Sequence, residues 1–230
     1  NRGATSKSGS ADVLEAAGIN LALSAEQIAT MIEQVGVGFM FAPAHHSAMK
    51  HVIAARKEIG VRTVFNILGP LTNPAAAPNQ IIGVFDPQWI PLLLEVLRDL
   101  GSDHVLIVAA EDGLDEISIA AATAVGELRG GEIYSYTVSP ADFGIKQYAN
   151  YDELKIDSAE ASLTLMRQAL TYENKAAGDI VALNAGAAIF AANLEDSLLN
   201  GVKRAQEVLI SGAALAKLDE LVRCSNSMSE

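Results

Sequence analysis

The chain has 230 residues, of which 50% are hydrophobic, so it is long and apolar enough to fold around a large core. Its 28 acidic and 16 basic residues give a formal net charge of −12 at pH 7. Because binding to a nucleic-acid backbone or an anionic membrane needs a basic face, this balance argues against nucleic-acid or membrane partners.

The cysteine count and the apolar runs indicate where the protein works. A single cysteine, Cys224, excludes an intrachain disulfide and a zinc knuckle and is typical of a reducing compartment, so we expect a cytoplasmic protein. The most apolar stretch, Ile180–Ala192, is interrupted by Asn184 and is too short to span a bilayer. The chain opens with Asn1-Arg2, neither an initiator methionine nor a signal peptide, so we expect a further segment upstream.

The first quarter of the chain is predicted to be a loop followed by helices. Glycines and serines in Asn1–Ser10 favour an irregular loop. Helical periodicity with a terminating glycine follows three times, and a brief apolar run lies between the second and third helices. The predicted helices are Ala11–Ala17, Ser24–Val35 and about His45–Glu58, and the apolar run is Val37–Ala42.

A strand, a helix and a second strand are predicted next, at Gln80–Phe85, Trp89–Leu100 and His104–Ala109. This is a βαβ unit, whose strands are parallel. Because ligands of such sheets bind at the carboxyl ends of the strands, the residues that follow Ala109 become candidates for a site.

The remainder of the chain contains a hairpin and three helices. Thr123–Leu128 and Glu132–Thr137 have β-like patterns and are separated by Arg129-Gly-Gly, which is typical of a hairpin turn. The predicted helices are Ser158–Leu170, Ala176–Ala192 and Ser197–Arg223. Since no linker divides the chain, we expect one α/β domain over residues 1–230, with a mixed, mostly parallel sheet flanked by helices.

Three sets of residues could carry chemistry. The loop Asn1–Ser10 combines cations, hydroxyls and glycines before a helix, which suits a phosphate group, although a solvated tail has the same composition. Arg56 lies on the same helical face as His45 and Met49 and could hold a carboxylate, or its stem could simply pack against the core.

The third set is acidic and follows the second predicted strand. Asp112, Asp115 and Glu116, with Gly113 among them, place carboxylates where an α/β sheet binds its ligands. Carboxylate oxygens beside a diphosphate are the ligands that Mg²⁺ prefers, but an acidic surface loop is an equally good interpretation.

Four motifs together resemble the anthranilate phosphoribosyltransferase family and appear in that family's order. They are Asn-Arg-x-x-x-Ser-Lys-Ser-Gly-Ser-Ala-Asp at 1–12, Phe-Ala-Pro-Ala-His-His-Ser-Ala-Met-Lys at 41–50, Arg62 to Pro74 and Gly113-Leu-Asp-Glu-Ile-Ser118. The Asn-Ile-Leu-Gly-Pro-Leu-Thr-Asn-Pro and Leu-Asp-Glu-Ile-Ser stretches are the most specific of them, and the resemblance covers essentially the whole chain.

The resemblance implies an activity and a set of binding residues. It implies transfer of the phosphoribosyl group of phosphoribosyl diphosphate to the amine of anthranilate, a step of tryptophan biosynthesis, by a homodimer. Asp115 and Glu116 would bind Mg²⁺, and no residue would act as a catalytic acid or base. The residues implied for anthranilate are Asn1, His46 and Arg56, and those for phosphoribosyl diphosphate are Asn1, Arg2, Gly3, Ala4, Thr5, Ser6 and Ser10.

The family also has an N-terminal helical segment, a Gly-rich phosphate loop and a Lys-His-Gly motif before the position of Asn1. These are absent from the given sequence. We therefore expect the 230-residue chain to be inactive alone, and residues of about 43–60 to pack against the missing helical domain.

Two other functions remain open at this point. Pyrimidine nucleoside phosphorylases resemble the transferase family in fold, but they need a pocket for a nucleobase in place of a clamp for a carboxylate. Arg56 favours the transferase. A homologue that binds nucleic acid without catalysis is the other alternative, against which the charge of −12 argues.

Overall fold

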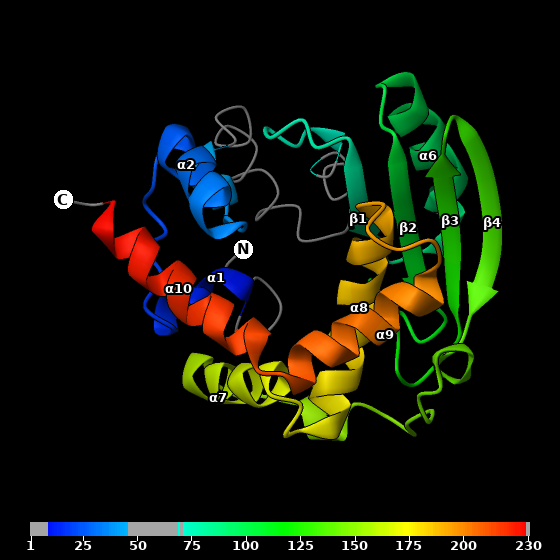
Figure 1. The fold of residues 1–230 in the computed structure, drawn as a ribbon. Helices are drawn as coiled ribbons and strands as arrows, with labels where there is room; N and C mark the ends of the chain where they lie inside the picture. The colour runs from blue at the N-terminus through cyan, green and yellow to red at the C-terminus, as the bar shows by residue number, and fades with distance from the viewer. Residues whose placement is uncertain (1–8, 46–68, 70, 229–230) are drawn as a thin grey trace, which may run out of the picture.

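The computed structural model describes residues 9–45, 69 and 71–228 as a four-stranded sheet with helices on both of its faces and a group of helices to one side (Figure 1). The α-helices are α1 (Ser10–Ala16), α2 (Ala25–Val35), α3 (Ala42–His45), α6 (Ile90–Asp99), α7 (Ala159–Leu170), α8 (Lys175–Ala191), α9 (Leu198–Ile210) and α10 (Ala213–Ser227). The strands are β1 (Asn79–Gly83), β2 (His104–Ala110), β3 (Thr123–Arg129) and β4 (Glu132–Val138), and short 3-10 helices are η2 (Pro87–Trp89), η3 (Pro140–Phe143) and η4 (Asp152–Leu154).

The sheet has the strand order β1-β2-β3-β4. Strands β1 and β2 are parallel and joined through α6, so the predicted βαβ unit is confirmed. The predicted hairpin is also confirmed, because Arg129 pairs with Glu132 across a two-residue turn.

The sheet is mixed and flanked by helices, as predicted, but the expectation that it is mostly parallel is wrong for the strands that the structure describes. Both β2 with β3 and β3 with β4 are antiparallel. The reason is local: β3 is reached from β2 without a helical crossover, and β4 follows from β3 through a tight turn, and such short connections join antiparallel neighbours.

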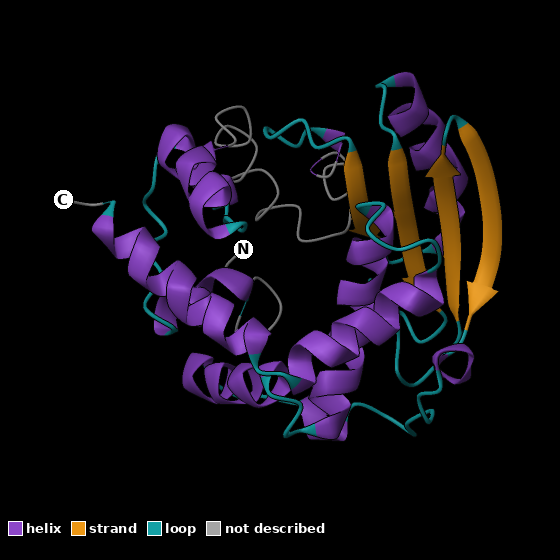
Figure 2. Ribbon diagram, in the orientation of Figure 1, coloured by secondary structure: helices purple, strands orange, loops and turns teal. Residues whose placement is uncertain are grey.

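Strand β2 is the centre of the core, and all seven of its residues are buried. Its side chains alternate between the two faces, so that Leu106 and Val108 pack with α8 and α9 while Val105 and Ile107 pack with α6. Figure 2 shows these layers, with helices in front of and behind the sheet. The unbroken apolar pattern of β2 thus follows from burial on both faces.

The last helix differs from its prediction. The stretch predicted as one helix, Ser197–Arg223, forms α9 and α10, which are separated at Gly212. Gly212 has a φ of 75°, a left-handed conformation that glycine adopts without a steric penalty and that interrupts a helix. Helix α10 also runs on to Ser227, so it includes Cys224, which lies just beyond the predicted end at Arg223.

Helices α2 and α10 share a hydrophobic core of their own. Ile28 and Met31 of α2 pack with Leu218 and Leu221 of α10, apart from the two clusters that cover the sheet. The interpretation of residues 1–230 as one domain stays a prediction. The predicted helix His45–Glu58 lies outside the described residues beyond His45, which ends α3.

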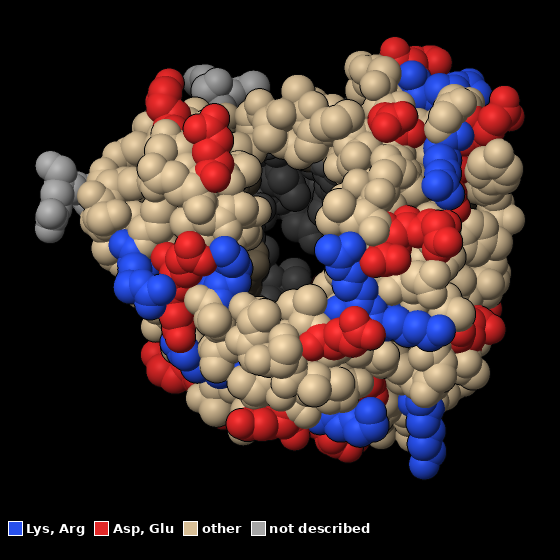
Figure 3. All heavy atoms as spheres, viewed as in Figure 1, with Lys and Arg blue, Asp and Glu red and all other residues tan. Residues whose placement is uncertain are grey.

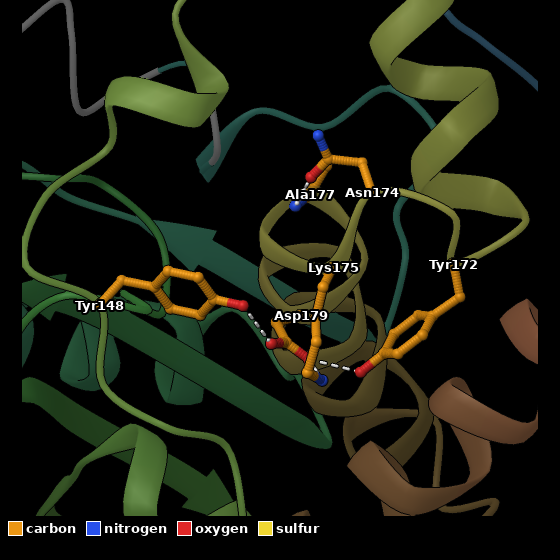
Figure 4. Close-up of polar contacts among 6 residues, drawn as sticks. All are labelled: Tyr148, Tyr172, Asn174, Lys175, Ala177 and Asp179. Atoms are coloured by element: carbon orange, nitrogen blue, oxygen red, sulfur yellow. Dashed lines mark hydrogen bonds and ion pairs between the residues drawn. The ribbon is translucent and has the colours of Figure 1, made fainter.

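The start of α8 is fixed by one buried carboxylate. Asp179, only 1% exposed, accepts hydrogen bonds from the hydroxyls of Tyr148 (2.8 Å) and Tyr172, and Lys175 Nζ lies 3.4 Å away (Figure 4). Burial and this bond to Asp179 raise the pKa of Tyr172 to about 12, so its hydroxyl keeps its proton at neutral pH. Asp179 therefore joins α8 to the segments before α7 and α8.

We expect Asp179→Ala to destabilise the fold by about 2–4 kcal/mol, because the change leaves two tyrosine hydroxyls without their acceptor. Urea unfolding monitored by circular dichroism measures this. Asp179→Asn keeps one acceptor oxygen and should lose less. An alanine variant as stable as the wild type would show that the carboxylate contributes nothing.

Candidate active site

An acidic loop, residues 111–118, follows β2 at its carboxyl end. Gly113 N donates to Ala110 O (3.0 Å) and Ala110 N donates to Leu114 O (3.0 Å), which closes a tight turn. Gly113 has a φ of 87°, so the glycine noted in the sequence is required by the backbone here. The turn leaves the side chains of Asp115 and Glu116 exposed at its outer end.

The end of β1 lies directly against this loop. A Cβ atom added to Gly83, the last residue of β1, would lie 1.6 Å from the backbone oxygen of Asp115. No side chain fits in that space, so Gly83 permits the loop to approach the sheet. The structure therefore brings the acidic loop to the carboxyl ends of the two parallel strands, where the sequence placed it.

Asp115 and Glu116 form a pair with an unfavourable electrostatic interaction. Partial desolvation by the surrounding protein and the negative charge of Asp115 raise the pKa of Glu116 above its usual value. A divalent cation between two such carboxylates would remove this repulsion, and Mg²⁺ is commonly held by one or two carboxylates together with phosphate oxygens. The donor set therefore fits Mg²⁺. No group of three or more His, Cys, Asp or Glu side chains suited to a metal occurs in the part of the chain that the structure describes.

The raised pKa of Glu116 predicts a pH dependence of stability. The folded chain binds this proton more tightly than the unfolded chain, so the ionised form of Glu116 lowers stability as the pH rises above about 4.5. We expect Glu116→Gln to have a higher Tm than the wild type at about pH 8 and the same Tm at about pH 4, with a small difference because solvent screens the side chain. Thermal unfolding across this range is the measurement, and an equal Tm at every pH would contradict it.

Asp112 has a different environment from its two acidic neighbours. Its Oδ2 accepts hydrogen bonds from the hydroxyls of Ser118 (2.9 Å) and Tyr151, and its Oδ1 accepts from Leu114 N (3.3 Å). The acidic cluster predicted from the sequence therefore divides into one hydrogen-bonded carboxylate and a pair of neighbouring carboxylates that repel each other. Sequence reasoning missed Tyr151, because nothing in its local pattern points to a partner 39 residues away.

The other predicted site residues are only partly within the described residues. Ser10 is exposed and begins α1, whose preceding residue Gly9 donates its N–H to Asp12 Oδ2 (2.9 Å). Asn1, Arg2, Gly3, Ala4, Thr5, Ser6, His46 and Arg56 lie outside the described residues.

A cavity of about 440 Å³ adjoins the acidic loop on the side of η2. It is lined by residues that follow β1 and β2, among them Phe85, Asp86, Glu111 and Gly113. Asp86 also caps η2 by accepting a hydrogen bond from Gln88 N (3.0 Å). On the face drawn in Figure 3, basic and acidic side chains are interspersed around a central hollow.

Among the residues that the structure describes, no helix is both long and apolar enough to cross a membrane.

Comparison with known proteins identifies the family. Residues 1–215 match the glycosyl transferase family, a/b domain. The chain belongs to this family. Of the curated relatives, anthranilate phosphoribosyltransferase of Hahella chejuensis is 57% identical over 234 residues, a match that covers all of this chain and 67% of the relative.

Solved structures of the glycosyl transferase family share the fold. The anthranilate phosphoribosyltransferase of Thermus thermophilus superposes with a TM-score of 0.90 at 42% identity, over 98% of this chain and 67% of that one. The Saccharomyces cerevisiae enzyme, solved in complex with phosphoribosyl diphosphate and magnesium, has a TM-score of 0.87 at 24% identity, over 98% and 63% of the two chains. The chain thus spans about two thirds of the length of the curated relatives it matches, 65% in Burkholderia cenocepacia.

Proposed function

We propose that the protein transfers the phosphoribosyl group of phosphoribosyl diphosphate to the amine of anthranilate, in tryptophan biosynthesis. The observation that carries the proposal is the acidic loop, which presents Asp115 and Glu116 at the carboxyl ends of β1 and β2. Its support is that this loop occurs in a chain 57% identical to an anthranilate phosphoribosyltransferase.

The proposed reaction is a substitution at C1 of the ribose. The bond from the anthranilate nitrogen to C1 forms while the bond from C1 to the diphosphate oxygen breaks, and the diphosphate leaves with the electron pair. The proton of the amine passes to solvent. Because an aryl amine is already neutral at pH 7, no residue is needed as a strong base, and catalysis rests on alignment and charge stabilisation.

Within this proposal, Asp115 and Glu116 hold Mg²⁺ with their exposed carboxylates. When bound, the ion supplies positive charge that stabilises the departing diphosphate. The loop exposes both of these consecutive residues at its outer end, whereas the hydroxyls of Ser118 and Tyr151 engage Asp112. In the yeast enzyme, which shares the fold, magnesium accompanies phosphoribosyl diphosphate.

The substrate contacts of the proposal come from the sequence motifs. Asn1, Arg2, Gly3, Ala4, Thr5, Ser6 and Ser10 contact phosphoribosyl diphosphate, and Asn1, His46 and Arg56 contact anthranilate. Arg56 binds the anthranilate carboxylate through a two-pronged interaction that guanidinium groups make well. The protein works as a cytoplasmic homodimer, and its net charge of −12 argues against nucleic-acid partners.

Genetic complementation tests the proposed activity. The gene in its native form should restore growth without tryptophan to a bacterial strain that lacks anthranilate phosphoribosyltransferase. The purified enzyme should consume anthranilate only when phosphoribosyl diphosphate and Mg²⁺ are present, followed by loss of anthranilate fluorescence. Failure of both experiments would overturn the proposal.

We expect the double change Asp115→Ala with Glu116→Ala to abolish Mg²⁺-dependent activity and leave the fold intact, because exposed acidic loops contribute little to stability. The measurement is the rate against Mg²⁺ concentration, with circular dichroism to show folding. Asp152→Ala, which removes an exposed carboxylate of η4 paired with Lys155, is the matched control and should leave the Mg²⁺ dependence unchanged. An unchanged Mg²⁺ dependence in the double variant would eliminate the metal assignment.

We expect Arg56→Ala in the active enzyme to raise the KM for anthranilate far more than the KM for phosphoribosyl diphosphate. The change removes a carboxylate partner and touches no phosphate, and loss of a charge-assisted pair is worth about 2 kcal/mol, or ~30-fold in KM. Steady-state kinetics with each substrate varied in turn measures the effect. Equal changes for both substrates would mean that Arg56 has a structural role.

A further inference from the structure

We propose that Tyr151 is a positioning residue for the acidic loop, residues 111–118. Acting through Asp112 and Ser118, its hydroxyl fixes the backbone that carries Asp115 and Glu116. The inference rests on the proposed function and adds to it a residue that contacts neither metal nor substrate.

The side chains of Asp112, Ser118 and Tyr151 meet at the base of the acidic loop. The hydroxyls of Ser118 and Tyr151 both reach Asp112 Oδ2, and the two hydroxyl oxygens are 2.5 Å apart. Ser118 is fully buried and its Oγ also accepts from the backbone N–H groups of Ala120 (2.8 Å) and Ala121 (2.9 Å). The network therefore links Asp112 near the start of the loop with Ser118 at its end.

The carboxylate of Asp112 is fully engaged in hydrogen bonds of this network. Both of its carboxylate oxygens accept hydrogen bonds from the chain, Oδ2 from two hydroxyls and Oδ1 from Leu114 N. Burial and the bond to Asp112 raise the pKa of Tyr151 to about 12, so the hydroxyl stays a donor at neutral pH. A carboxylate engaged in this way holds the loop in place, and it leaves metal binding to its exposed neighbours.

Helix α8 fixes the loop from the other side. Asn184 of α8 accepts from Ile117 N (2.8 Å) and donates to Ile117 O (3.0 Å), so that one amide satisfies both backbone groups of the residue after Glu116. With Tyr151 and Asp112 at one position and Asn184 at another, Asp115 and Glu116 lie between two anchored points.

Anchoring matters here because the two carboxylates repel each other. Asp115 and Glu116 are consecutive acidic residues and both are exposed, so a relaxed loop would let the two like charges move apart, and the loop would have to be ordered again when a cation binds. Residues that hold metal ligands in place typically change metal affinity by about 10–100-fold when they are removed. Tyr151 acts through the backbone, and we expect the lower end, about tenfold.

The test is Tyr151→Phe, which removes the hydroxyl and keeps the ring. Mn²⁺ replaces Mg²⁺ as the probe, and the signal of free Mn²⁺ in electron paramagnetic resonance gives its affinity in the presence of phosphoribosyl diphosphate. We expect about tenfold weaker Mn²⁺ binding than in the wild type. Tyr172→Phe is the matched control, because it removes a hydroxyl that also donates to a carboxylate, Asp179 at the start of α8 (Figure 4).

The control separates positioning from general loss of stability. Tyr172→Phe should lower the Tm at least as much as Tyr151→Phe and should leave Mn²⁺ affinity unchanged. A second variant, Asp112→Asn, keeps an oxygen acceptor for the hydroxyls but loses the charge. We expect it to retain Mn²⁺ affinity within about threefold, whereas loss of a metal ligand would weaken binding about ten times more than that.

Two different failures can be told apart. If the wild type binds Mn²⁺ and Tyr151→Phe binds it equally well, or if Tyr172→Phe weakens binding as much, the positioning role of Tyr151 is overturned and the metal site remains. These measurements use the enzyme encoded by the gene in its native form, and if that wild type shows no binding of Mn²⁺ with phosphoribosyl diphosphate, the proposed function is overturned and this inference with it.

Discussion

The burial of helix α8 is the constraint on which the rest of the structure depends. Ten of its residues are buried, because it packs against β1 and β2 as well as α7 and α9. Its sequence is accordingly rich in alanine and lacks a single apolar stripe. A helix packed against so many elements has a fixed position, and the groups that form hydrogen bonds to it are held in position as well.

Two polar residues of α8 transmit this rigidity to the loops around the site. Asn184, which interrupts the most apolar stretch of the sequence, pairs with the backbone of Ile117. Asp179 holds Tyr148, whose backbone N–H donates to Ile119 O (2.9 Å) just beyond the acidic loop, residues 111–118. Placing a half-buried amide and a buried carboxylate in an apolar helix is costly unless they are paired, and here the pairing fixes the loops.

Local signals of the sequence were enough for most elements and insufficient for their interactions. Local sequence patterns predict α2, α6 and the hairpin to within a few residues. They miss the break at Gly212, because the helical pattern of residues 197–223 continues on both sides of this glycine. The contact of Tyr151 with Asp112 joins residues far apart in the chain, and no period or spacing encodes it. The predicted hairpin already implies the antiparallel pairing of β3 with β4, which the expectation of a mostly parallel sheet does not take into account.

The acidic loop shows why the sequence alone leaves such a site ambiguous. Asp112, Asp115 and Glu116 have nearly the same chemistry and lie within five residues, so composition treats them as one cluster. What separates them is the partners that the fold supplies. Hydroxyl donors engage Asp112, while Glu116 has a like charge beside it and a pKa raised by desolvation and by this charge. A carboxylate that already accepts hydrogen bonds stabilises the folded chain, whereas a pair of carboxylates that repel each other gains most from a cation. The unfavourable interaction therefore favours Asp115 and Glu116 over Asp112 as the proposed metal ligands.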